Sequence, residues 1–182
     1  MRFALVRFAL IAATLWVGSA GAQPVADEYQ VKAAYLLNFS RFVEWPASVL
    51  PASSPLEIAI VGGNPFGGTL EDLLRGKSAN GHPIQLRHPR WDETLTAYHI
   101  VFISASEETH LPQILRNLAN SSVLTVSDID RFALRGGVIE FRMVGNRVRF
   151  DINRTTAVVA QINISSKLLS VARAVHEGGV AP

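Results

Sequence analysis

The fold is organised around the stretch Val31-Lys-Ala-Ala-Tyr-Leu-Leu-Asn-Phe-Ser-Arg-Phe-Val-Glu-Trp-Pro46. Its apolar residues recur at helical spacing, and Pro46 supplies a stop because the residue before a proline is pushed out of the helical region. This predicts a helix from Asp27 or Glu28 to Trp45 that lies on a core. The predicted buried arc comprises Val31, Ala34, Tyr35, Leu36, Phe39, Phe42, Val43 and Trp45, and the opposite side comprises Ala33, Leu37, Ser40, Arg41 and Glu44.

After this helix, short apolar strands alternate with short helices. Strands are predicted at residues 56–61, 84–87, 99–103 and 123–126, and helices at residues 69–75, 112–118 and 155–160, with a last helix capped by Ser165 that carries an apolar stripe as far as Val175. Such alternation is typical of a single three-layer α/β domain, here residues 23–182. Its sheet should be mixed but largely parallel, with helices on both faces.

The end of the sheet changes period. Residues 138–143 and 147–152 alternate strictly around Gly145-Asn146, which predicts an antiparallel hairpin near the C-terminus. The turn fixes the register and sets three apolar pairs on one face: Ile139 with Ile152, Phe141 with Phe150, and Met143 with Val148.

The other face of this hairpin is charged. It is either a solvated face, balanced by diagonal pairs of opposite charge, or a docking face for a protein partner. In the second interpretation the partner contacts are Arg142, Arg147 and Arg149.

The first 22 residues have the three parts of a secretory signal peptide. Arg2 and Arg7 precede an apolar run, and Ala20-Gly21-Ala22 forms a small-residue cleavage site before Gln23. A retained N-terminal anchor is the alternative, but the run is short for a membrane span. Without Arg2 and Arg7, the 17 basic residues fall to 15 and match the 15 acidic residues. The mature chain is therefore near neutral, and it lacks the basic stripe that nucleic-acid binding requires.

The sequence lacks the residues that several kinds of chemistry require. The chain has no cysteine, which excludes disulfides, thiol catalysis and thiolate metal sites. Its five histidines do not recur at metal-binding spacing, so no metal is expected. No nucleophile, acid and base can be nominated as catalytic, and the turn at Gly62 lacks one glycine of the dinucleotide fingerprint, so no cofactor is expected.

The parallel strands also predict a crevice. Ligands of such sheets bind beyond the carboxyl ends of the strands. In this chain that edge gathers a small set of polar and glycine residues, and we expect any ligand crevice there: Gly62, Gly63, Asn64, Ser104, Ser106, Ser127 and Asp128.

With these segments placed, the chain resembles the YfiR-like family of periplasmic proteins that restrain membrane-bound diguanylate cyclases. The resemblance runs from about Glu28 to Arg173. It is carried by the opening stretch together with Ile60-Val-Gly-Gly-Asn-Pro-Phe66, Val123-Leu-Thr-Val-Ser-Asp128, Gly136-Gly-Val-Ile139, Val148-Arg-Phe-Asp-Ile-Asn153 and Ile164-Ser-Ser-Lys-Leu-Leu169.

This resemblance implies a periplasmic α/β domain, commonly a homodimer, that acts by contact with a signalling protein of the inner membrane and performs no catalysis. Any thiol-based redox control in the family is in doubt here, since the chain has no cysteine. A small-ligand sensor or binding protein that uses the crevice is the alternative function. Both can hold together, because a ligand that prefers one state shifts regulation by its differential affinity.

Overall fold

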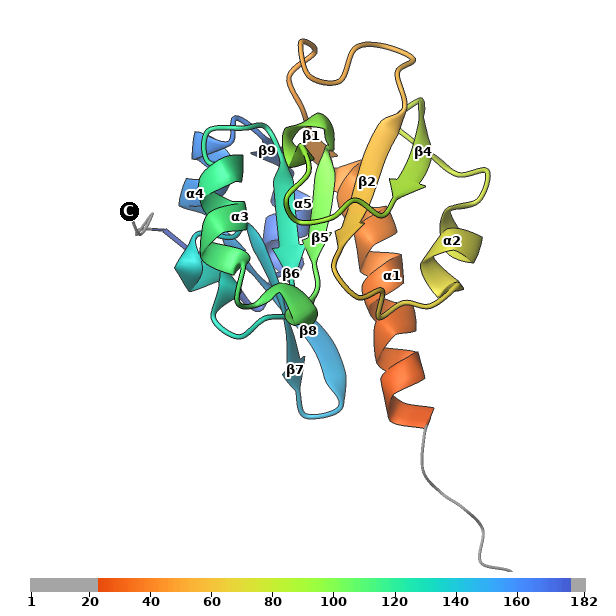
Figure 1. Cartoon of the computed structure of the whole chain (residues 1–182), viewed down its shortest axis with the longest axis vertical. Coiled ribbons are helices and arrows are strands. Elements are labelled where there is room, and N and C mark those ends of the chain that lie inside the picture. Colours follow the sequence, from red (N-terminus) through yellow and green to blue (C-terminus); the bar gives the residue numbers. More distant parts are fainter. Residues whose placement is uncertain (1–22, 178–182) are drawn as a thin grey trace, which may run out of the picture.

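Helix α1, Gln23–Phe42, runs along one face of an eight-stranded sheet (Figure 1). The structure is a computed structural model that describes residues 23–177, with side chains from residue 28 onwards. The expected signal peptide, residues 1–22, therefore lies outside the described residues. Within the described part of the chain, no helix combines the length and apolar character needed to cross a membrane.

The strands of this sheet lie in the order β10-β8-β7-β6-β5-β2-β4-β3. Neighbours from β4 to β7 run parallel, as do β8 and β10, while the pairs β7–β8 and β3–β4 are antiparallel. Their bounds are β2 Leu56–Val61, β3 Ser78–Ala79, β4 His82–Arg87, β5 Ile100–Ile103, β6 Leu124–Ser127, β7 Ile139–Val144, β8 Arg147–Asn153 and β10 Ala174–His176. A separate antiparallel pair joins β1, Val43–Glu44, to β9, Asn163–Ile164.

Helices cover both faces of the sheet, which confirms the three-layer α/β class. One core lies under α1 and takes residues from α2, Thr69–Leu74, from α4, Arg154–Val159, and from α5, Ser166–Val171. The other core lies under α3, Leu111–Leu118, with the short 3-10 helices η1, Leu95–Ala97, and η3, Phe132–Arg135. Neighbouring residues of β2 divide between the cores, since Ile58 belongs to the first and Ala59 to the second.

The prediction for α1 was right in type but wrong in its end and in part of its buried face. The helix ends at Phe42, because the next two residues pair with β9 instead of continuing to Trp45. Val31, expected inside, is 43% exposed, whereas Ala33, Leu37 and Ser40, expected outside, are buried. Ser40 can be buried since its hydroxyl donates to the Leu37 carbonyl oxygen at 2.7 Å.

Two further elements differ from their predictions. The last helix stops at Val171, and Val175 lies in strand β10, because the Arg173 N–H donates to the Phe150 carbonyl oxygen and starts a parallel pairing with β8. The short strand β3 was not predicted. The helix cap at Ser165 is confirmed, as its side chain accepts a hydrogen bond from the Leu168 N–H.

The hairpin β7–β8 has the predicted register. Ile139 faces Ile152, Phe141 faces Phe150, and Met143 faces Val148. The prediction that the charged face is solvated was wrong for the part of that face farthest from the hairpin turn. Glu140 and Asp151 are only 2% and 1% exposed there, because η3 and β10 cover them.

Specific bonds satisfy these two buried carboxylates. Glu140 accepts hydrogen bonds from the backbone N–H groups of Arg131 and Ala133, and Asp151 is paired with Arg173. The expected diagonal ion pairs across the hairpin are replaced by these bonds and by a contact between Arg142 and Glu140 at 2.7 Å.

His99, just before β5, is a buried imidazole held in its neutral form. Its Nδ1 accepts a hydrogen bond from the Glu57 N–H at 3.0 Å, so Nε2 carries the proton, 3.3 Å from the Val49 carbonyl oxygen. Burial lowers the pKa of His99 below its ordinary value of 6.5, and the charge of His82 acts in the same direction. The Val49 carbonyl and Glu57 oppose the shift.

We expect acid to destabilise the protein partly through His99. At a pH between 6.5 and the lower folded-state pKa, the unfolded chain binds a proton that the folded protein excludes, so stability falls as the pH falls through this range. Urea unfolding of the wild type and of His99→Gln should therefore show a shallower acid loss in the variant. Equal losses in the two proteins would contradict this assignment.

Candidate functional site

A groove lies beside the hairpin, between its tip and the N-terminal half of α1. It encloses about 370 Å³, and we call it the α1–hairpin groove. The tip of the hairpin and this half of the helix extend in the same direction beyond the rest of the sheet (Figure 1). Eight residues line the groove: Glu28, Val31, Tyr35, Met143, Asn146, Arg147, Val148 and Arg149.

Aromatic packing fixes the two walls of this groove. The ring of Tyr35 lies 5.2 Å from that of Phe150, and Phe39 stacks on Phe141 at 5.7 Å between ring centroids. These contacts join α1 to the apolar face of the hairpin that the sequence predicted. Val31 and Met143 remain 43% and 44% exposed at the rim. Apolar side chains at the rim are therefore open to a partner.

A second hollow of about 280 Å³ continues from the groove towards β6. It shares Glu28 and Met143 with the groove and adds a buried charged cluster. Lys32 is only 2% exposed, and its ammonium group lies 2.5 Å from Glu28 and 2.6 Å from Asp128. The Tyr29 ring packs against the same ammonium group at 4.2 Å.

Asp128 joins this cluster to the carboxyl end of β6. One of its carboxylate oxygens, Oδ2, accepts hydrogen bonds from Lys32 and from the Tyr29 hydroxyl at 2.7 Å. The other oxygen, Oδ1, is buried with no hydrogen-bond partner among the described residues. The pKa of Tyr29 is raised, first by burial and then by its bond to Asp128, so the phenol stays protonated and keeps donating.

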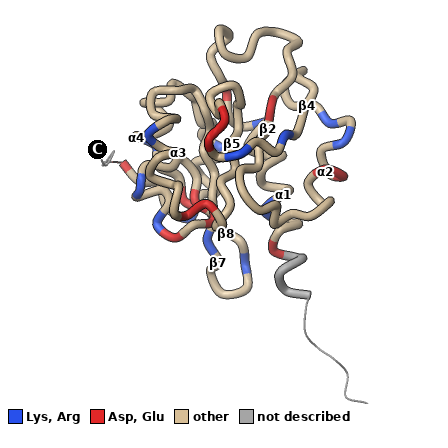
Figure 2. The backbone as a smooth tube through the Cα atoms, in the orientation of Figure 1, with Lys and Arg blue, Asp and Glu red and all other residues tan. Residues whose placement is uncertain are grey.

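The three arginines expected to dock a partner lie together on β7 and β8. Arg147 and Arg149 are exposed, and both line the groove. Arg142 lies directly opposite Arg149 in the register, but it is half-buried and is also within 3.5 Å of Asp130. Figure 2 shows basic residues on both strands of the hairpin. Two of the three arginines are therefore free to meet a partner, while Arg142 also holds Glu140.

The residues of the expected ligand crevice do gather at one sheet edge, but most of them bond to each other or to nearby backbone. The Gly63 N–H donates to the Ser106 hydroxyl at 2.9 Å. A Cβ atom on Gly62, whose φ is +90°, would lie 2.5 Å from the same hydroxyl. The 3-10 helix η2, Ala105–Glu107, therefore packs directly over this turn.

The remaining crevice residues follow the same pattern. The Asn64 side chain closes its own turn by accepting from the Phe66 N–H at 3.0 Å. Ser127 is fully buried and donates to the Ile103 carbonyl oxygen, and Ser104 is 6% exposed. Of the predicted set, Asp128 lines the hollow described above.

Sequence reasoning missed the buried cluster. It named Asp128 but not Lys32, Tyr29 or Glu28. A lysine in a helix is normally solvated, and the one local signal was the spacing of four residues between Glu28 and Lys32.

The chemistry of the site favours binding of a protein segment. It combines exposed apolar side chains with two exposed arginine residues of β8, and guanidinium groups pair well with carboxylates. Among residues 28–177 no group of three or more histidine or acidic side chains is placed to hold a metal ion.

Comparison with known families decides the assignment. The model of the YfiR/HmsC-like family matches residues 29–173. The chain belongs to this family. The match covers α1 from residue 29, the sheet up to the start of β10, and the residues that line the groove except Glu28. The family resemblance drawn from the sequence is thereby confirmed.

One solved structure is similar in fold. It is a conserved domain protein from Vibrio cholerae O1 biovar El Tor, with a TM-score of 0.55 and 13% sequence identity. The match covers 81% of the chain described here and 60% of the Vibrio chain, so our chain spans about three fifths of the length of the Vibrio protein. At this identity the likeness shows the fold alone.

Proposed function

We propose that this protein is a periplasmic regulator that binds an inner-membrane signalling protein, a diguanylate cyclase or a comparable sensor, and holds it inactive. Cyclic di-GMP output falls as a result. The single observation that carries this proposal is membership of the YfiR/HmsC-like family over residues 29–173. The signal-peptide pattern, with cleavage before Gln23, supports export to the periplasm.

The α1–hairpin groove is the surface we assign to the membrane partner. It is hollow, has exposed apolar residues, and carries Arg147 and Arg149 on its rim. Holding a target about 99% inactive from an even balance requires a preference of a few kcal/mol for the inactive state. An interface of standard size, roughly 1,600 Å², supplies that much. The groove would form the centre of such an interface, with the arginines fixing its orientation.

The same proposal includes a homodimer. Val158, Val171 and Val175 are 67%, 58% and 39% exposed and lie on α4, α5 and β10. Strand β10 is also an edge strand of the sheet, with one side unpaired in the described residues. We assign the homodimer contact to this edge, which lies at the opposite end of the strand order from β3. No residue that lines the α1–hairpin groove lies on α4, α5 or β10, so a homodimer formed here leaves the groove open to a different protein.

The alternative function, a sensor with its ligand in the crevice, remains a proposal. A ligand at the turn formed by Gly62, Gly63 and Asn64 would have to displace η2 or exchange its hydrogen bonds with Ser106. The regulator interpretation needs no such rearrangement.

Gene deletion in the native host tests the proposed function. We expect cyclic di-GMP and surface attachment to rise and motility to fall in the deletion strain, and plasmid-borne protein to reverse these changes. The control strain also lacks the cyclase that the protein restrains, and there the deletion should have no effect. Unchanged cyclic di-GMP and motility while the membrane partner is expressed would show that the protein is not its repressor.

A further inference from the structure

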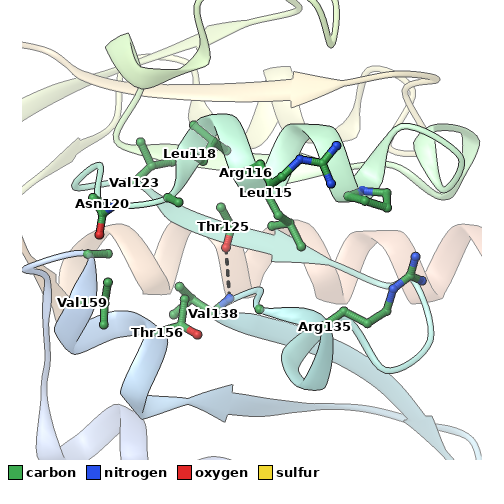
Figure 3. Close-up of a pocket in the computed structure, with 14 residues that line it drawn as sticks. Leu115, Arg116, Leu118, Asn120, Val123, Thr125, Arg135, Val138, Thr156 and Val159 are labelled. Carbon is green, nitrogen blue, oxygen red and sulfur yellow. Dashed lines mark hydrogen bonds between the residues drawn. The ribbon is translucent and has the colours of Figure 1, made fainter. Parts of the chain in front are cut away.

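A separate cavity of about 370 Å³ lies between α3 and α4, away from the hairpin tip. We call it the α3–α4 cavity. Helix α4 follows β8, and the C-terminal end of β8 pairs with the N-terminal end of β7. Helix α4 therefore lies beside β6, at the end of the sheet where the parallel strands begin. Figure 3 shows the cavity walls formed by α3, the start of β6, the turn before β7, and α4. This is the opposite sheet edge from the predicted crevice.

The cavity wall is mainly apolar. Leu118, Val123 and Val138 are buried side chains of the surrounding core, and Val159 contributes from α4. The Thr125 hydroxyl already accepts a hydrogen bond from the Val138 N–H at 3.0 Å (Figure 3). Small-molecule sites are typically hollows of this volume with apolar walls and few polar groups. The cavity therefore has the size and surface of a binding site for a small apolar body.

Positive charge gathers at one end of the cavity. Arg116 of α3 and Arg135 of η3 come from opposite walls and point towards the same end (Figure 3). Arg135 is paired with Glu108 at 3.1 Å, whereas Arg116 has no ion pair among the described residues. Arg116 is exposed, so its guanidinium group is solvated in the free protein and is available to pair with a ligand that carries a single negative charge.

We propose that the α3–α4 cavity binds a small monoanionic amphiphile, a molecule with a compact apolar body and one carboxylate. The apolar body lies between Leu118, Val123 and Val159, and the carboxylate meets the guanidinium group of Arg116 beside Arg135. The proposal goes beyond the proposed function, because it concerns a different surface and needs no membrane partner.

Calorimetric titration of the purified mature protein with octanoate tests this site, with 1-octanol as the uncharged control. We expect saturable one-to-one binding of octanoate that is about tenfold tighter than that of 1-octanol, since a charge-assisted hydrogen bond contributes about that factor. Arg116→Gln should weaken octanoate about tenfold and leave 1-octanol unchanged.

Filling the cavity should abolish the binding of both octanoate and 1-octanol. Val159→Trp places a large ring at a position that is 43% exposed, so the fold should tolerate it, and the matched control Val49→Trp adds the same ring at a position that is 38% exposed and lies outside the cavity. Binding that survives Val159→Trp, or that does not distinguish octanoate from 1-octanol, would overturn the proposal. If Val159→Trp fails to fold, the Arg116→Gln titration decides alone, and equal octanoate binding by this variant and the wild type rejects the site.

Discussion

Lys32→Met should lower the free energy of unfolding by about 3–5 kcal/mol, because it leaves Asp128 charged at the end of β6 without its ammonium partner. The ammonium group is buried and contacts two carboxylates and the face of Tyr29. Methionine matches the length of the lysine stem, so the loss would come from charge and not from a cavity. Urea unfolding of the purified mature protein measures this difference.

Two further variants separate charge from packing. Lys167→Met makes the same change at an exposed position of α5, and it should alter stability by less than about 0.5 kcal/mol. Lys32→Met combined with Asp128→Asn removes the more deeply buried of the two carboxylates that lose their partner, so this double variant should be more stable than Lys32→Met alone. A Lys32→Met protein within about 1 kcal/mol of the wild type would show that the cluster contributes little to the fold.

The cluster matters for function through the position of α1. Lys32 and Tyr29 hold the N-terminal half of this helix to Asp128, and the same half forms one wall of the α1–hairpin groove. A loosened helix would change the shape of the groove before the protein unfolds.

The class of fold could be predicted from the sequence because strand and helix patterns alternate clearly and the hairpin turn fixes its own register. The orientation of α1 could not. Apolar residues surround this helix on most sides, so periodicity alone does not say that Ala33 and Leu37 face the core while Val31 faces solvent. The choice is made by tertiary packing against the sheet, α2 and α5.

The candidate site was predicted only in part, for a related reason. Sequence alternation placed Glu140 and Asp151 on the polar face of the hairpin. It could not show that η3 and β10 bury part of that face, because these contacts join residues that are distant in the sequence. The helical spacing of apolar residues placed Val175 in a helix, so strand β10 was not predicted. The arginines near the tip stay exposed because no element covers them there, so the expected docking residues Arg147 and Arg149 remain available.

Reversing both of these arginines should produce the largest loss of function. In the double variant Arg147→Glu/Arg149→Glu, two attractive groups on the groove rim become repulsive towards an acidic partner surface. Like charges brought together at an interface cost several kcal/mol, so we expect affinity for the periplasmic part of the membrane cyclase to fall at least about 100-fold. Arg142 is left unchanged, because it also pairs with the buried carboxylate of Glu140.

The matched control is Arg41→Glu/Lys77→Glu, which makes the same change in net charge at two exposed positions outside the groove. It should bind as the wild type does. Binding of the wild type should also weaken as salt is raised, since exposed charges are screened, whereas the residual binding of the groove variant should not. If the groove variant is as stable as the wild type and still binds and represses the cyclase normally, the hairpin is not the docking surface, and the partner must contact another face.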